Sequence, residues 1–189
     1  MIKVAIIGAE NVGKSTLMNA LLGEKISETM PVPGTTKRVI KKVFGTVKIP
    51  KTMKNPFGGA DELVLIDTAG LYDPQHELRG KVLSEGKFKE LIEEIVSADV
   101  VIHMIDAQYG LHRGMEKLHH ILKFRYEKPI IVVVNKIDLI PKEKVDELRE
   151  IIEKRLEQRP VMLSLVTFEG FNDLLRALVY YAQYAKNKS

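Results

Sequence analysis

Five short runs of apolar, mostly β-branched residues recur along the chain, separated by longer polar stretches. Near-continuous apolarity over so few residues is typical of strands that are buried on both faces, as in a sheet covered by helices. A further stretch, residues 39–49, is longer, rich in lysine and interrupted by Gly45, which predicts an edge strand. The buried strands are predicted at residues 2–7, 63–66, 100–105, 130–134 and 161–163.

Between the strands, apolar residues recur at helical spacing. Helices are predicted at residues 16–22, 88–95, 115–122 and 171–178, and Pro141 predicts the start of another, because proline suits a first helical turn. Alternating strands and helices predict an α/β three-layer sandwich around a mostly parallel, six-stranded sheet with one antiparallel edge strand. We expect one domain over residues 1–185, an exposed hairpin connection at 48–60 and a frayed tail at 186–189.

Composition narrows the class of protein. No apolar run approaches the roughly 18 residues of a membrane span, cysteine is absent, and the chain enters a strand at once, which leaves no room for a secretory signal. We therefore expect a cytoplasmic protein. The net charge of +4 is compatible with an RNA-containing partner, although many proteins without such a role carry a similar charge. The five histidines predict no metal site, since the adjacent His119 and His120 would point about 100° apart on a helix.

The most informative motif follows the first predicted strand. Residues 8–15 read Gly-Ala-Glu-Asn-Val-Gly-Lys-Ser, a complete G-x-x-x-x-G-K-[ST] pattern between a strand and a helix. The glycines let the backbone approach a polyphosphate, and successive N–H groups then point at it. Lys14 adds a cation for the β- and γ-phosphates, and Ser15 a hydroxyl for Mg²⁺. The predicted phosphate ligands in this loop are Asn11, Val12, Gly13, Lys14, Ser15 and Thr16.

Two other segments predict contacts with the metal and the terminal phosphate. Residues 67–70 read Asp-Thr-Ala-Gly after the strand at 63–66. Asp67 can hold Mg²⁺ through water, and the N–H of Gly70 can approach the γ-phosphate. Residues 33–36 read Pro-Gly-Thr-Thr, where one threonine hydroxyl could complete the Mg²⁺ shell and sense the γ-phosphate.

Residues 135–138 read Asn-Lys-Ile-Asp and close the strand at 130–134. A carboxylate that accepts two hydrogen bonds from one edge of a ligand makes a strong, directional contact. Guanine offers N1–H and N2–H₂ side by side, whereas adenine offers no such pair, so Asp138 predicts selection of guanine. Asn135 would brace the loop, and the stem of Lys136 could cover the base.

With these segments in this order, the chain resembles the translation-factor-related GTPases, most closely the Era/TrmE group. In that group the phosphate loop often reads Asn-Val-Gly-Lys-Ser, as residues 11–15 do, and the switch loop Gly-Thr-Thr, as residues 34–36 do. The resemblance covers essentially the whole chain and implies the Ras-like G domain of the P-loop NTPases. It makes Thr36 a Mg²⁺ ligand and residues 67–70 the second switch. It also adds a last guanine-contacting loop at Ser164 and Leu165.

The residue after Gly70 bears on the mechanism. Ras-type GTPases place a glutamine there to orient the attacking water, whereas Leu71 has no polar atom to do so. The chain therefore resembles the group with a hydrophobic replacement, in which an asparagine at the position of Asn11 is associated with a bound K⁺ that stabilises transition-state charge. The alternative is that Asn11 only tolerates unusual backbone angles. No general base is assigned; Lys14, Thr36 and Gly70 are the candidates for stabilising the transition state or positioning water.

Three functions are compatible with these motifs. The first is a slow, Mg²⁺-dependent GTPase switch, stimulated by K⁺ or a partner, in a ribosome- or RNA-related process and with a nucleotide-dependent dimer formed through the switch regions. The second is a GTP-binding interaction or assembly module with negligible turnover. The third is a P-loop kinase or ATPase, against which residues 135–138 argue.

Overall fold

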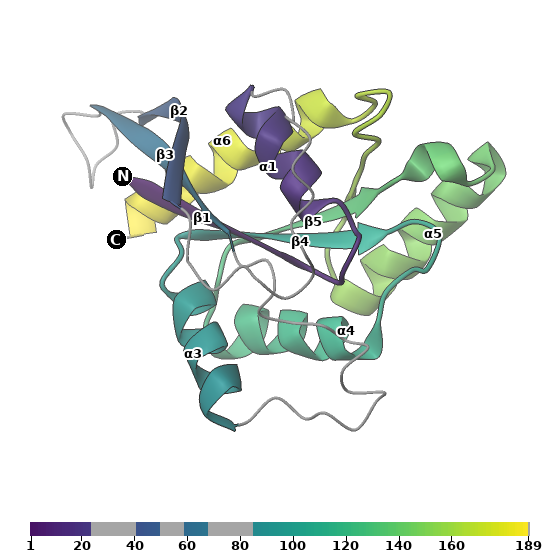
Figure 1. The fold of residues 1–189 in the computed structure, drawn as a ribbon, viewed down its shortest axis with the longest axis horizontal. Coiled ribbons are helices and arrows are strands. Elements are labelled where there is room, and N and C mark those ends of the chain that lie inside the picture. The colour runs from purple at the N-terminus through teal and green to yellow at the C-terminus, as the bar shows by residue number, and fades with distance from the viewer. Residues whose placement is uncertain (24–40, 50–58, 68–84, 189) are drawn as a thin grey trace.

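The computed structural model describes residues 1–23, 41–49, 59–67 and 85–188. Within these ranges strands and helices alternate, as the apolar pattern predicts (Figure 1). The strands are β1 (Ile2–Gly8), β2 (Lys41–Ile49), β3 (Gly59–Asp67), β4 (Val100–Asp106), β5 (Ile130–Asn135) and β6 (Val161–Met162). The helices are α1 (Lys14–Leu22), α3 (Glu85–Val96), α4 (Arg113–His120), η1 (Ile121–Arg125), η2 (Ile137–Leu139), α5 (Lys142–Leu156) and α6 (Phe171–Lys188).

The strands form one six-stranded sheet in the order β2-β3-β1-β4-β5-β6. β3, β1, β4, β5 and β6 pair in parallel, and β2 runs antiparallel to β3 at the edge. The predicted mostly parallel sheet with one antiparallel edge strand is therefore confirmed. Because the five parallel strands point the same way, the loops that follow Gly8, Asp106, Asn135 and Met162 lie along one edge of the sheet.

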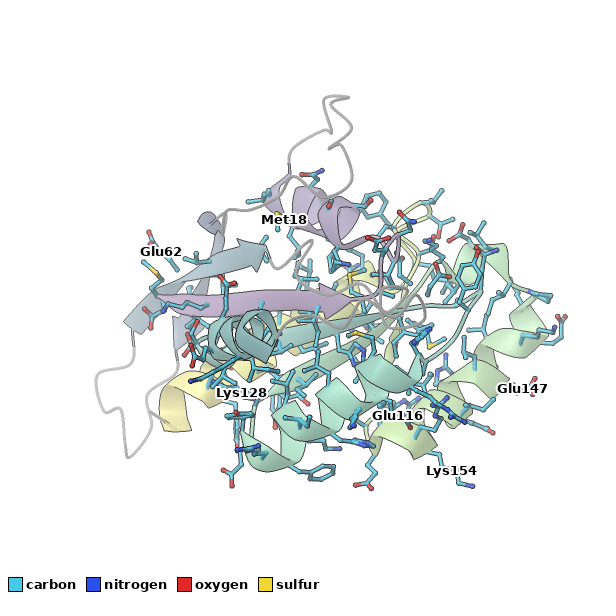
Figure 2. The ribbon with its side chains drawn as sticks, turned by 60° about the horizontal axis from the view of Figure 1, so that its bottom comes forward. Met18, Glu62, Glu116, Lys128, Glu147 and Lys154 are labelled. Atoms are coloured by element: carbon cyan, nitrogen blue, oxygen red, sulfur yellow. The ribbon has the colours of Figure 1, made fainter. Side chains whose placement is uncertain are left out.

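Helices cover both faces of this sheet, so the molecule has three layers (Figure 1). Alternate residues of each strand point to opposite faces. In β4, Ile102 and Met104 pack in the core that α1 and α6 cover, whereas Val101 and Ile105 pack in the core formed with α3, α4 and α5. Figure 2 shows the two sides: Met18 lies on α1 and Glu116 on α4. No described helix is long and apolar enough to cross a bilayer.

Several element boundaries differ from the sequence prediction. The antiparallel pairing of β2 with β3 extends to Gly59, so only residues 50–58, rather than 48–60, separate the two strands. The helix predicted at 115–122 is divided between α4 and η1, a wider helical turn. α6 continues to Lys188, so residues 186–188, which were predicted to fray, belong to the helix. Apolar spacing reports the buried part of an element and therefore does not locate its exposed ends.

Candidate functional site

The phosphate loop at residues 8–15 connects the end of β1 to the start of α1, and it requires both of its motif glycines. A Cβ atom on Gly8 would lie 2.7 Å from the carbonyl oxygen of Met104. A Cβ atom on Gly13, whose φ is +102°, would lie 2.5 Å from the Nδ2 atom of Asn135. The loop can therefore pack this closely against β4 and β5 only with glycine at both positions.

The N-terminus of α1 follows directly. Gly13 caps this helix, no side chain among the described residues makes a cap hydrogen bond, and the first turn contains no acidic residue. A helix start of this kind presents N–H groups that have no partner within the helix, together with positive partial charge, and both favour an anion. Lys14 adds a full positive charge, and its Nζ donates to two carbonyl oxygens of the loop at 2.8 and 2.6 Å. Ser15 and Thr16 are exposed in the first turn. This donor set fits a Mg²⁺-bound polyphosphate.

Asn135 is buried at the end of β5 and bonds two loops at once. Its Nδ2 donates to the carbonyl oxygen of Val12 at 2.9 Å, and its Oδ1 accepts from the N–H of Leu165 at 3.3 Å. Both ends of the amide are therefore satisfied, and the phosphate loop is fixed relative to the loop after β6. The brace that was predicted for Asn135 is present.

Lys136 links the same segment to the neighbouring residue of the phosphate loop. Its backbone is left-handed, with φ of +67°. Its Nζ donates to the carbonyl oxygen of Asn11 at 2.6 Å and to Oδ2 of Asp106, also at 2.6 Å. Asn11 has a φ of +58°, a conformation that asparagine tolerates better than most residues, and its side chain is exposed. The left-handed backbone supports the interpretation that Asn11 is present because it tolerates unusual backbone angles. The exposed side chain is also accessible to a K⁺ ion, as the other interpretation requires.

The remaining guanine-motif residues lie beside this brace. Asp138 is exposed in η2. The N–H of Ile137 donates to the carbonyl oxygen of Leu163 at 3.3 Å, which keeps η2 next to the loop after β6. Ser164 is fully buried, and its hydroxyl accepts from the N–H groups of residues 166 and 167 at 3.3 and 3.1 Å. The Ser164 side chain therefore shapes the loop, and Leu165 is tied to Asn135 through its backbone.

Two of the predicted residues are not described, and a third is described only by its backbone. Thr36 and Gly70 lie outside the described residues, as does Leu71. The backbone of Asp67 ends β3 and lies beside Ile6 of β1. Asp67 is therefore at the same edge of the sheet as the phosphate loop.

Sequence reasoning missed Asp106, which ends β4 and is only 8% exposed. Besides its ion pair with Lys136, its Oδ1 accepts from the N–H of Gln108 at 2.9 Å. A signal was present in the sequence. Asp106 is the polar residue that ends a buried apolar run, as Asp67 and Asn135 are for theirs.

A second buried polar group was also missed. The Nδ1 atoms of His103 in β4 and His119 in α4 lie 3.2 Å apart, and both side chains are fully buried. Burial, with the nearby His119, lowers the pKa of His103 to about 3. Burial also lowers the pKa of His119 to about 4, aided by the charges of Lys123 and His120. Both rings are therefore neutral at neutral pH. No group of three or more described His, Cys, Asp or Glu side chains could hold a metal ion.

The family of the chain follows from a comparison with known proteins. A family model described as 50S ribosome-binding GTPase matches residues 3–136. The match begins in β1 and ends at Lys136, so it includes the phosphate loop and both residues that bond to it, Asn135 and Lys136. The chain belongs to this GTPase family.

Individual relatives confirm the similarity to the Era group. GTPase Era of Aquifex aeolicus is 33% identical over 181 residues, which are 94% of this chain and 56% of Era. A crystal structure of Era in complex with MgGDPNP and a segment of 16S ribosomal RNA matches with a TM-score of 0.67 at 31% identity, covering 95% of this chain and 56% of that one. An uncharacterized protein of Methanocaldococcus jannaschii is 42% identical over 179 residues, 95% of each chain. The chain thus spans about half the length of the Era relatives it matches.

Proposed function

We propose that this chain binds GTP and hydrolyses it to GDP and phosphate as a Mg²⁺-dependent molecular switch. The observation that carries the proposal is the pair of braces from Asn135 and Lys136 to the carbonyl oxygens of residues 12 and 11. They join the base-reading segment to the phosphate loop, so a ligand with guanine at one end and a polyphosphate at the other would meet both. Membership of a GTPase family supports the same ligand.

In this proposal the phosphates lie at the N-terminus of α1. The backbone N–H groups of residues 11–16 donate to them, Lys14 directs its charge at the β- and γ-phosphates, and the N–H of Gly70 meets the γ-phosphate. Mg²⁺, when bound, would neutralise charge on these phosphates. The residues assigned to Mg²⁺ are Ser15, Thr36 and, through water, Asp67. The Era complex with MgGDPNP supports Mg²⁺ as the metal.

The guanine base lies over the segment that follows β5. Asp138 accepts hydrogen bonds from N1–H and N2–H₂, and its exposure leaves the carboxylate accessible for both. The stem of Lys136 covers one face of the base, while Asn135 holds the loop in place. The loop at Ser164 and Leu165 closes the far edge of the base.

Hydrolysis is expected to be slow, because Leu71 has no polar atom that could orient water. Lys14 and the backbone of Gly70 would stabilise charge on the γ-phosphate, and Thr36 would help to position the water. The exposed side chain of Asn11 is proposed as a ligand of K⁺, which would add positive charge between the β- and γ-phosphates.

The proposed partner is a ribosomal or other RNA–protein complex in the cytoplasm. The description of the family names the 50S ribosome, and the Era structure contains 16S ribosomal RNA. A net charge of +4 suits such a partner. A nucleotide-dependent dimer through the switch regions stays a prediction from the sequence.

Phosphate release under single-turnover conditions tests the activity. We expect release from GTP that is faster in KCl than in NaCl of equal concentration, with the difference abolished by Asn11→Ala. Equal rates in the two salts would refute the K⁺ role. Tight GTP binding without release in either salt would instead favour the interaction module with negligible turnover, for which the apolar Leu71 is the supporting observation.

Base selection is tested by Asp138→Asn. Losing a charged acceptor for two hydrogen bonds should weaken GTP binding by about 100-fold and favour xanthine nucleotide. Displacement of a fluorescent GDP analogue by GTP, XTP and ATP measures this. Asp146→Asn, on the exposed surface of α5, is the matched control and should change nothing. Unchanged GTP affinity in Asp138→Asn, or stronger displacement by ATP in the native protein, would contradict guanine selection and point to a kinase or ATPase.

A further inference from the structure

Asp106 is held at the end of β4 by contacts that leave one carboxylate oxygen directed at Lys136. Its Oδ1 accepts from the N–H of Gln108 at 2.9 Å. The backbone is fixed as well, because Asp106 pairs with Asn135 across β4 and β5, and the next N–H donates to the Asn135 carbonyl at 2.9 Å. The carboxylate is therefore placed by the sheet and not by a flexible loop.

Lys136 bridges this carboxylate and the phosphate loop. Its Nζ lies 2.6 Å from Oδ2 of Asp106 and 2.6 Å from the carbonyl oxygen of Asn11. The ion pair is largely sheltered, with side-chain exposures of 28% for the lysine and 9% for the aspartate. A sheltered charge-assisted contact is stronger than a surface ion pair and strongly directional.

The Lys136 side chain borders a cavity as well as its ion-pair partner. Lys136 and Asp106 line a cavity of about 340 Å³ that also borders residues 9–11 and the loop at 108–112. A lysine side chain has many rotamers, and ordering it costs on the order of 2 kcal/mol. Beside such a cavity, the Asp106 carboxylate is the group that selects the rotamer reaching Asn11.

We infer that Asp106 is a positioning residue for nucleotide binding: it holds Lys136 across the phosphate loop and thereby keeps the base-reading segment and the phosphate loop in one fixed geometry. The inference rests on the proposed guanine-nucleotide function of this site. Asp106 does not touch the nucleotide itself; it acts through Lys136. Its loss should therefore shorten the lifetime of bound GDP.

The decisive variant is Asp106→Asn. An asparagine keeps an oxygen that can accept from the N–H of Gln108, but it removes the charge that faces Lys136. We expect the release of a fluorescent GDP analogue, chased with excess GDP, to become about tenfold faster or more. Asp99→Asn is the matched control, because Asp99 likewise accepts a backbone N–H, that of Lys3 at 2.8 Å, next to the opposite end of β4. It should leave the rate unchanged.

A double-mutant cycle with Lys136→Met distinguishes positioning through Lys136 from a purely structural role. Lys136→Met should speed GDP release by itself, and adding Asp106→Asn to it should then have no further effect. Lys136→Met breaks the same ion pair from the other side, so a native rate of GDP release in this variant would contradict the inference even if Asp106→Asn does not fold.

Two results would overturn the inference. The first is GDP release at the native rate in Asp106→Asn or, if that variant does not fold, in Lys136→Met. The second is that Asp106→Asn speeds GDP release equally in the native background and in the Lys136→Met background. A failure of the underlying function looks different. In that case the native protein would bind GDP no better than ADP, before any variant is compared.

Discussion

Asn135 at the end of β5 and the pair of His103 in β4 and His119 in α4 are all buried polar residues, but their hydrogen bonds are satisfied to different degrees. Asn135 uses its amide nitrogen and its amide oxygen, each toward a different loop. The two histidines bond each other through Nδ1, and no described residue bonds either Nε2 atom. A polar group whose hydrogen bonds are all made fixes one geometry. For a group with an unmade hydrogen bond, the stability of the contact depends on its protonation state.

The histidine pair shows this dependence in detail. Only one Nδ1 can carry a proton in their hydrogen bond, so the two neutral rings hold opposite tautomers. One Nε2 is then a donor without an acceptor, and the other an acceptor without a donor. A further proton would place a cation in a buried site beside a second ring, which is why the pKa values of His103 and His119 are low. The loops at the site are thus held by a fully bonded amide, whereas the contact of β4 with α4 includes two neutral rings that share one hydrogen bond.

Acidification should reveal this contrast most strongly. In the unfolded chain both histidines bind protons below about pH 6.5, whereas in the folded protein their pKa values are about 3 for His103 and about 4 for His119. Between these values the unfolded state binds more protons, so stability falls as the pH falls. From about pH 7.5 to about pH 5 we expect the free energy of unfolding to drop by about 2 kcal/mol per histidine, or about 4 kcal/mol for the pair. Urea unfolding at the two pH values measures this drop.

The double variant His103→Leu with His119→Leu is the control for acidification. It removes both titrating rings and should flatten the dependence on pH, whatever its stability at neutral pH. Staying above pH 5 keeps Glu116 largely ionised, because the hydrogen bond from Arg155 lowers the pKa of that carboxyl from its ordinary value of 4.5. A drop as large in the double variant as in the native protein would show that other groups cause it.

Asn135→Ala tests the fully hydrogen-bonded group of the comparison, the Asn135 amide. The substitution leaves the carbonyl of Val12 and the N–H of Leu165 without their partner, which should cost about 3 kcal/mol of unfolding free energy. Because no titrating group is involved, the loss should be the same at about pH 7.5 and about pH 5, in contrast to the histidine effect.

The matched control is Gln183→Ala. Gln183 also donates from a side-chain amide to a carbonyl oxygen, that of Lys48 at 2.7 Å, but at an exposed position. Its loss should be below about 1 kcal/mol. Similar losses in Asn135→Ala and Gln183→Ala would mean that burial adds nothing to the brace at the end of β5.

The strands and both nucleotide motifs could be predicted because their signals are local. Buried strands appear as apolar runs, and β2 could be recognised as an edge by its lysines and by Gly45, where its register shifts. Asp106 and the histidine pair are defined instead by contacts between elements. Asp106 meets Lys136 across 30 positions, and His103 meets His119 across 16. A local pattern can mark Asp106 as the polar end of a buried strand, but it cannot identify the partner, since that depends on which strand and helix become neighbours.

Arg155→Met should have the smallest effect on stability. It removes an ion pair between α4 and α5, near the histidine pair but separate from Asn135. In α5, Arg155 donates from Nε to Oε1 of Glu116 in α4 at 3.0 Å and pairs with its other oxygen as well. Glu116 is labelled on α4 in Figure 2. The partners are 36% and 23% exposed, so we expect a loss of about 1 kcal/mol, smaller in high salt.

The value of Arg155→Met lies in its dependence on pH. α4 carries both Glu116 and His119, so a loosened contact with α5 could admit water to the histidine pair. If the buried rings respond to acid independently of this ion pair, Arg155→Met lowers stability equally at about pH 7.5 and about pH 5, as urea unfolding would show. A weaker dependence on pH in the variant would mean that the ion pair helps to keep His103 and His119 dry, because hydrated rings would recover pKa values closer to 6.5.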